Sequence, residues 1–209
     1  MRSVAVDFSL LATPGWRDDV SSRFTALWRS VADSRALWHA GSDSLTKAAN
    51  AVTNCAIESM YDADGSAVLR CNERGVRRAL RARLARDKEQ HLKRCLSLFD
   101  EMTASIDKLR SAVRGIVAMA SDPQTFAVTL SNGVGQLHEF AALATELSDA
   151  YEREHDVKRR ILSDIAVCES LETLNVYLSA LLLEVFVTPC ARRADPIAES
   201  ITLAKSHDD

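Results

Sequence analysis

The 209-residue sequence has little glycine and little proline, seven residues of the first and four of the second. Both residues mark turns and interrupt helices, so their scarcity argues against a fold of many short elements. Aromatic residues are also few, at 6%, whereas alanine, leucine, serine and arginine are the most frequent residues. We therefore expect an all-α protein with long helices and few connections.

Closely spaced cysteine pairs are missing, and charge of one sign does not prevail. The five cysteines are Cys55, Cys71, Cys95, Cys168 and Cys190. An odd number of distant cysteines indicates free thiols in a reducing compartment, the nucleus or the cytosol, rather than a disulfide framework. A net charge of −3 excludes a general attraction to nucleic acid or anionic membrane, so any basic surface must be local.

Targeting signals and membrane spans are not expected. Asp7 interrupts the modestly apolar start of the chain, and no small-residue cleavage pattern follows it, which argues against a signal peptide. No window approaches the length and hydropathy of a membrane span by this reading, so we expect no membrane partner.

Apolar residues recur at alternating spacings of three and four along most of the chain. This heptad stripe is typical of long helices that pack side by side. We read Gly133 and Gly135 as a loop that the next helix leaves, and Thr125 to Leu130 as a short extended segment. The predicted helices are residues 18–61, 72–120, 136–168 and 172–187, the last almost wholly apolar and buried on most sides.

Residues 18–190 are expected to form one domain, an elongated antiparallel helical bundle or coiled coil of three long helices with one or two short C-terminal helices. Residues 1–17 are expected to be a flexible N-terminal segment, and residues 191–209 a short terminal helix and tail. Asp195 is the expected N-cap of that helix and Pro196 its first residue. Because heptad seams commonly need a partner helix to close them, we expect a hetero-oligomer.

Residues 62–73 partly match a calcium-binding loop, with Asp62, Asp64 and Glu73 at ligand positions. Ala67 stands where the loop needs glycine for its sharp turn, and no second loop exists to form the usual pair. A polar connection between helices is the favoured interpretation, and a calcium-responsive helical protein is the alternative.

Catalytic and metal-binding motifs find little support. Glu152 and His155 have the spacing of helical di-iron ligands, but such a centre needs this motif twice and it occurs once. The zinc-binding, phosphate-loop and nucleophile-elbow patterns are absent. We therefore expect no catalytic residue, no metal and no cofactor, and a protein that is not an enzyme.

The stretch from Arg70 to Arg94 holds ten basic residues and three acidic ones. Arg77, Arg78 and Arg81 form a candidate basic patch. The arginines spread around the helix, however, and no aromatic side chain is interleaved to stack on bases. An acidic protein partner or a solvated face is therefore favoured over nucleic acid.

The C-terminal third carries a family resemblance. "YEREHDVKRRILSDIA", followed by "LNVYLSALLLEVFV", resembles the signature end of the cyclin-dependent kinase 2-interacting protein family. The matching positions are Tyr151, Glu154, Lys158, Arg159, Tyr177, Leu178, Ser179, Phe186 and Val187. Upstream, the pattern of the family's first helix is matched by Trp38, Ala49, Asn50, Val52 and Asn54.

The resemblance implies a nuclear, non-catalytic adaptor, with the cytoplasm as a second location. Such an adaptor would link cyclin-dependent and replication kinases in DNA replication and checkpoint signalling. It would also serve in an AAA ATPase complex for replisome upkeep and ribosome biogenesis, beside a second small helical subunit. The alternatives are a basic-helix nucleic-acid-binding protein and a coiled-coil subunit of another assembly.

Partner-binding residues are expected on the two helices that carry the resemblance. Tyr151, Glu154 and Lys158 fall on the heptad seam, where a lone bundle would place apolar residues, so we expect a partner protein to cover them. The full candidate set is Tyr151, Glu154, Lys158, Arg159, Tyr177, Leu178, Ser179 and Phe186.

Overall fold

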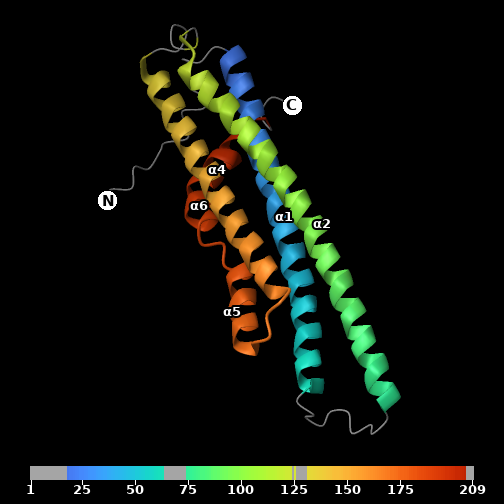
Figure 1. The fold of residues 1–209 in the computed structure, drawn as a ribbon. Helices are drawn as coiled ribbons and strands as arrows, with labels where there is room; N and C mark the ends of the chain where they lie inside the picture. The colour runs from blue at the N-terminus through green and yellow to red at the C-terminus, as the bar shows by residue number, and fades with distance from the viewer. Residues whose placement is uncertain (1–17, 64–73, 124, 126–130, 206–209) are drawn as a thin grey trace. The chain divides into compact units, whose positions relative to one another are not determined.

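The computed structural model describes residues 18–63, 74–123, 125 and 131–205 of the chain (Figure 1). Within these residues every regular element is a helix and no strand occurs, so the expected all-α class is confirmed. The helices are α1 (Asp18–Ala63), α2 (Arg74–Ser121), α4 (Ser131–Ile165), α5 (Leu171–Leu182) and α6 (Val187–Lys205).

Helix α4 begins five residues earlier than expected, and this corrects the interpretation of two glycines. It starts at Ser131, so Gly133 and Gly135 lie inside its first turns and not in a loop. Glycine costs up to about 1 kcal/mol relative to alanine in a helix interior, and less near a helix end, where the backbone is partly frayed. Thr125 is helical rather than extended, and residues 126–130 of that expected segment lie outside the described residues.

The C-terminal helices also differ from the expected ones. Ser170 caps α5, because its hydroxyl accepts a hydrogen bond from the Thr173 N–H at 3.3 Å. The helix ends at Leu182, since Leu183 takes an extended conformation. Helix α6 then starts at Val187, so Pro196 lies inside it and not at its first position.

Two compact units make up the chain. Helices α1, α2 and α4 contribute segments to both, α5 belongs to unit 2, and α6 belongs to unit 1. Unit 1 is drawn from Met1–Leu37, Ala104–Glu154 and Val185–Asp209, and unit 2 from Trp38–Thr103 and His155–Glu184.

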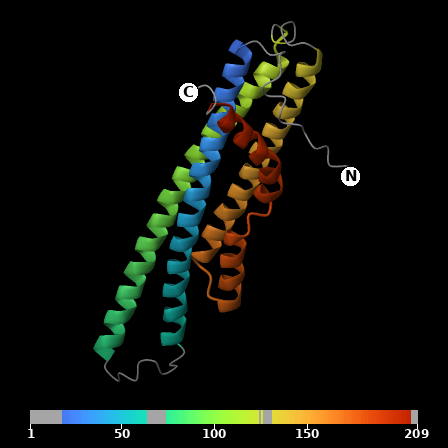
Figure 2. The same ribbon diagram turned by 180° about the vertical axis from the view of Figure 1, so that it is seen from behind.

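The core of unit 1 is built around three aromatic rings. Phe24 of α1 lies 5.1 Å from Phe140 of α4, and Trp28 lies 6.1 Å from the same ring, measured between centroids. Gly115 of α2 allows α1 to approach closely, because a Cβ there would stand 2.7 Å from a methyl carbon of Leu27. Helix α6 lies against α1 and α4, as Figure 2 shows from behind.

The core of unit 2 contains the seam residues of four helices. Trp38, Leu45 and Val52 of α1 are at most 1% exposed, as is Met102 of α2. The heptad positions of α2 in this unit are Leu92, Cys95, Phe99 and Met102. All of them are buried except Leu92, which is half-buried. Helix α5 packs beside α4, where Lys158 bonds to the Leu181 carbonyl, and it buries Leu174 and Leu181 (Figure 1). Glu184, just after α5, bonds to Ser42 of α1.

The apolar stretch Leu171–Pro196 corrects the expectation that no window approaches a membrane span. By length and composition alone it could cross a membrane, with a mean hydropathy of 1.6, and only 17% of the window is buried. The structure divides it between two helices, and α5 has 12 residues. Those residues span about 18 Å, well short of the roughly 30 Å hydrocarbon core of a bilayer.

Candidate partner-binding surfaces

The charged run Tyr151–Arg160 lies in α4, and its seam residues point into the chain itself. Tyr151 and Lys158 are 0% exposed, and Glu154 is 1% exposed. They are therefore not available to a partner protein, which corrects their expected role. Their spacing of three and four does place them on the buried side of α4. Residues of α1, of α5 and of the segment just before α6 cover that side, and not a partner protein.

In unit 2, Lys158 caps the C-terminal end of α5. Its Nζ donates a hydrogen bond to the Leu181 carbonyl at 2.6 Å and lies 5.5 Å from the centre of the Trp38 ring. The last carbonyls of a helix lack intrahelical donors and carry partial negative charge, so a cation is favourable there. Helix α5 has no basic residue in its own last turn, and α4 supplies the cation instead.

Glu184 holds the segment that follows α5 against α1. Its carboxylate accepts a hydrogen bond from the Ser42 hydroxyl at 3.0 Å and pairs with His39 Nδ1 at 3.1 Å. Burial alone would raise the pKa of Glu184, but the contacts with His39 and Ser42 and the nearby Lys158 charge lower it on balance. The side chain is therefore a carboxylate that balances the buried Lys158 cation.

In unit 1, Glu154 anchors the start of α6. Its carboxylate accepts a hydrogen bond from the Phe186 N–H at 3.1 Å, one residue before the helix begins at Val187. The N-terminal end of a helix carries partial positive charge, so a buried carboxylate is stabilised at this place.

Arg35, a buried arginine in unit 1, bonds to both Tyr151 and Asp195. Arg35 of α1 donates one hydrogen bond to the Tyr151 hydroxyl at 3.2 Å and another to Asp195 at 2.6 Å. Burial would lower the pKa of Arg35, yet these two partners raise it on balance. Asp195 is thus the ion-pair partner of Arg35 and not a helix cap, because α6 begins eight residues before it.

Glu152 and His155 each have partners within their own unit. Glu152 accepts a hydrogen bond from Arg110 at 3.0 Å in unit 1. In unit 2, His155 stacks on Phe99 with 4.0 Å between centroids, and its Nε2 lies 3.0 Å from the Thr103 hydroxyl. No group of three or more metal-ligating side chains occurs in the part of the chain that the structure describes. Of the expected calcium loop, Asp62 belongs to α1, and residues 64–73 lie outside the described part.

The remaining candidate residues are either half-buried on α5 or exposed. Tyr177 and Leu178 are half-buried on its inner side, and the Tyr177 hydroxyl donates a hydrogen bond to Asp164 at 3.2 Å. Partial desolvation and the Asp164 carboxylate raise the pKa of Tyr177. The exposed candidates are Ser179, Phe186, Arg159, Arg77, Arg78 and Arg81.

Helix α5 also presents an exposed apolar surface that sequence reasoning missed. Val176 is 59% exposed, Leu182 69% and Leu183 61%. Val176 and Leu183 lie on the side opposite the buried Leu174 and Leu181, and Leu182 lies about 100° around the helix from Leu181. We call Glu172, Val176, Ser179, Leu182 and Leu183 the outer face of α5. The expectation that this helix is buried on most sides is wrong, because an almost wholly apolar sequence has no polar stripe to mark its solvent side.

No protein-family model matches this chain, and no curated protein matches it at a significant level of similarity.

Proposed function

We propose that this chain is a non-catalytic adaptor subunit of the kind represented by the cyclin-dependent kinase 2-interacting protein family. In this proposal it acts in the nucleus, links cell-cycle kinases in DNA replication and checkpoint signalling, and serves in an AAA ATPase complex. The observation that carries the proposal is the outer face of α5, where three large apolar side chains are 59–69% exposed. Large apolar side chains that are exposed close together on one helix mark protein interaction sites.

The residues that carry the family resemblance support this proposal indirectly. Lys158 bonds to the end of α5, and Glu154 bonds to the residue before α6. They hold the two C-terminal helices in place from the inside. We propose that they are positioning residues, and that the surface a partner contacts is the outer face of α5.

A protein partner suits this face better than a membrane does. Helices that lie on membranes carry lysine and arginine on their polar side, which attract anionic lipids. Helix α5 has neither residue, and Glu172 in its first turn would be repelled by such lipids. An apolar face with a carboxylate at one end fits the groove of another protein.

As the arrangement of the long helices, we propose the elongated antiparallel bundle that the heptad stripes predict. Small-angle X-ray scattering tests this part. A compact globule of this length has a radius of gyration of about 17 Å, so a clearly larger value is expected. A value near that of the globule would contradict an elongated bundle.

Affinity purification from nuclear extract followed by mass spectrometry tests the adaptor function. The wild-type chain should recover replication kinases or AAA ATPase subunits, and Val176→Asp/Leu182→Asp should lose them. Leu37→Asp is the matched control, because Leu37 is a 55% exposed leucine of α1 in unit 1. Recovery of neither protein class by the wild type would end the adaptor proposal, and equal recovery by all three chains would exclude the α5 face.

The exposed arginines of α2 support one alternative, a nucleic-acid-binding protein. Arg77 and Arg78 are exposed at the start of α2. This alternative predicts binding to DNA or RNA that weakens steeply with salt and is reduced in Arg77→Ala/Arg78→Ala. The absence of binding at low salt would remove it.

A further inference from the structure

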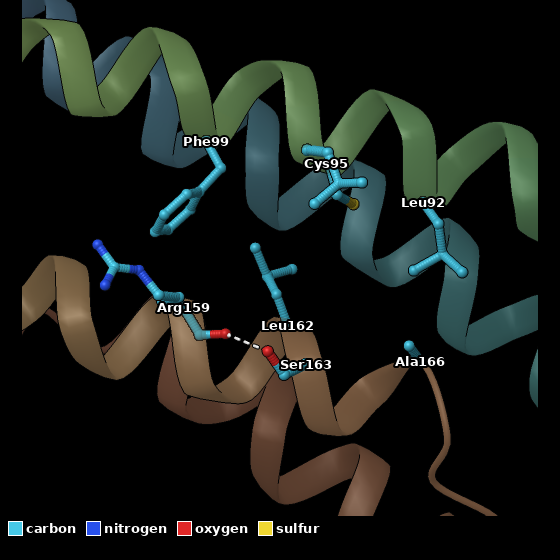
Figure 3. Close-up of a pocket in the computed structure, with 8 residues that line it drawn as sticks. Leu92, Cys95, Phe99, Arg159, Leu162, Ser163 and Ala166 are labelled. Atoms are coloured by element: carbon cyan, nitrogen blue, oxygen red, sulfur yellow. Dashed lines mark hydrogen bonds between the residues drawn. The ribbon is translucent and has the colours of Figure 1, made fainter.

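Unit 2 has an open apolar groove between α2 and α4, with a cavity of about 260 Å³. Figure 3 shows side chains of the two helices pointing toward each other across it. We call this the α2–α4 groove, and the residues that line it are Leu92, Cys95, Leu96, Phe99, Arg159, Leu162, Ser163 and Ala166.

The lining residues repeat the pattern by which one helix receives another. On α2 they stand at positions i, i+3, i+4 and i+7 from Leu92, and on α4 they follow the same spacing from Arg159. This is the spacing of a seam into which a third helix inserts its apolar side chains. Leu96 is 63% exposed, so the groove is open along its outer edge. The eight residues from Leu92 to Phe99 make the groove about 10 Å long.

Its polarity limits what the groove can hold. Arg159 is the one charged side chain among the described residues that line it, and its guanidinium lies 5.7 Å from the centre of the Phe99 ring. Asp156, its neighbour one turn away, is 3.5 Å distant, and both side chains remain about 60% exposed. The Ser163 hydroxyl donates to the Arg159 carbonyl of its own helix. The groove is therefore apolar with one accessible cation, and it suits an apolar helix that carries a single carboxylate.

The outer face of α5 has that composition. Glu172, Val176, Ser179 and Leu183 stand four, three and four residues apart, which places them in one row along the helix. Val176 and Leu183 are seven residues apart, the same separation as that between Leu92 and Phe99 at the two ends of the groove on α2. Both the carboxylate of Glu172 and the apolar side chains of this row are exposed.

We propose that two copies of this chain form a two-fold dimer in which the outer face of α5 of each copy lies in the α2–α4 groove of the other. Val176 and Leu183 fill the groove beside Leu96, and Glu172 pairs with Arg159. A reciprocal contact of this kind closes on itself and leaves neither surface free to build a longer chain. A face engaged in the dimer is not available to another protein, so self-association and adaptor binding exclude each other.

Sedimentation equilibrium on the purified full chain tests the dimer, at concentrations from about 1 to about 100 µM. The wild type should associate to a dimer, and Leu96→Asp and Val176→Asp should each raise the dissociation constant at least about tenfold. Leu37→Asp should leave it unchanged. A monomeric wild type, a series of larger oligomers, or a dimer indifferent to both groove and α5 variants would overturn the proposal.

Two mixing experiments test the reciprocal contact itself. A mixture of Leu96→Asp and Val176→Asp chains keeps one intact contact of the two, so the mixed dimer should be tighter than either variant alone. Arg159→Glu and Glu172→Arg should each weaken the dimer, and the double variant should restore it. Arg160→Glu, an exposed neighbour outside the groove, is the control. Failure of both restorations would exclude this pairing.

The variant Leu96→Asp separates this inference from the proposed function. It removes the dimer contact but leaves the outer face of α5 intact. If the dimer proposal fails and Val176→Asp/Leu182→Asp still loses the kinases or ATPase subunits, the adaptor function stands alone. If the dimer forms as described and no such proteins are recovered, the adaptor function fails and the dimer stands.

Discussion

Two strongly charged segments, the run Tyr151–Arg160 in α4 and the basic stretch of residues 74–94 in α2, have opposite surroundings in the structure. In the first, Tyr151, Glu154 and Lys158 are at most 1% exposed, and each bonds to another helix or to the residue before one. In the second, from Gly75 onward, Leu84 is the one fully buried residue. Two ion pairs within it are local, because Arg83 pairs with Asp87 and Lys93 with Glu89, each one turn apart.

The difference shows that the spacing of charged residues decides their surroundings more than their number does. Tyr151, Glu154 and Lys158 continue the seam that Leu147 begins and Ile161 resumes, so the packing that buries those apolar neighbours buries them too. The arginines of α2 stand on all sides of the helix and share no seam. Because Tyr151, Glu154 and Lys158 are buried, the loss of a hydrogen-bond partner would leave each of them unpaired away from water, at a cost in stability. The exposed arginines of α2 are solvated by water whether or not they have a partner.

The largest effect is expected for Lys158→Ala. The change leaves a cavity beside Trp38, removes the donor to the Leu181 carbonyl and leaves Glu184 without its nearby cation. Breaking a buried charged contact from one side costs about 3–5 kcal/mol. Urea unfolding followed by tryptophan fluorescence measures this loss.

Arg83→Ala is the control from the exposed segment. Its side chain is 74% exposed and its ion pair with Asp87 is local, so the free energy of unfolding should change by no more than about 0.5 kcal/mol. Similar losses for Lys158→Ala and Arg83→Ala would contradict the contrast between the two segments.

Glu154→Ala comes next in expected size. It leaves the Phe186 N–H at the start of α6 without its carboxylate acceptor, and a hydrogen bond to a charged group contributes about 1.5–3 kcal/mol. Limited proteolysis of the connection between α5 and α6 should become faster, together with a lower urea midpoint. Glu154→Gln keeps an acceptor of the same shape and should lose less. If the glutamine variant loses as much as the alanine variant, the charge and not the hydrogen bond is decisive.

The acid stability of unit 2 should depend on Glu184. Its pKa in the folded chain lies below its ordinary value of 4.5, so its carboxylate stabilises the fold above that pH. The contribution disappears as the pH falls through the lowered pKa, because the folded state must then bind a proton. Glu184→Gln should therefore lower the thermal midpoint at pH 7, by the equivalent of about 0.5–1 kcal/mol, and the gap to wild type should close under acid conditions. A gap that stays constant from neutral to acid pH would contradict this role.

Sequence reasoning predicted the helices better than their contacts. The repeat of three and four placed α1 and α2 within two residues of their observed ends, because it reflects a single helix and its buried side. It could not identify what covers the polar seam positions, since Leu181 and Phe186 approach α4 only through tertiary packing. The outer face of α5 was missed for the converse reason, as Val176 and Leu174 are equally apolar in sequence and differ only in burial.

The smallest effect is expected for Gly75→Ala, at the exposed start of α2. A Cβ there would meet nothing within 4 Å, so the substitution adds no clash and only removes the flexibility of glycine. Alanine is favoured over glycine within a helix by up to about 1 kcal/mol, and less near its end, where the backbone is partly frayed. The urea midpoint should therefore rise slightly.

The contrasting change is Gly41→Ala, whose Cβ would stand 2.7 Å from Met102 Cγ in the core of unit 2. It should lower the midpoint, because overpacking outweighs the gain in helix propensity. A stabilising Gly41→Ala would mean that Met102 moves aside, and that this part of the core is less tightly packed than the surroundings of Lys158.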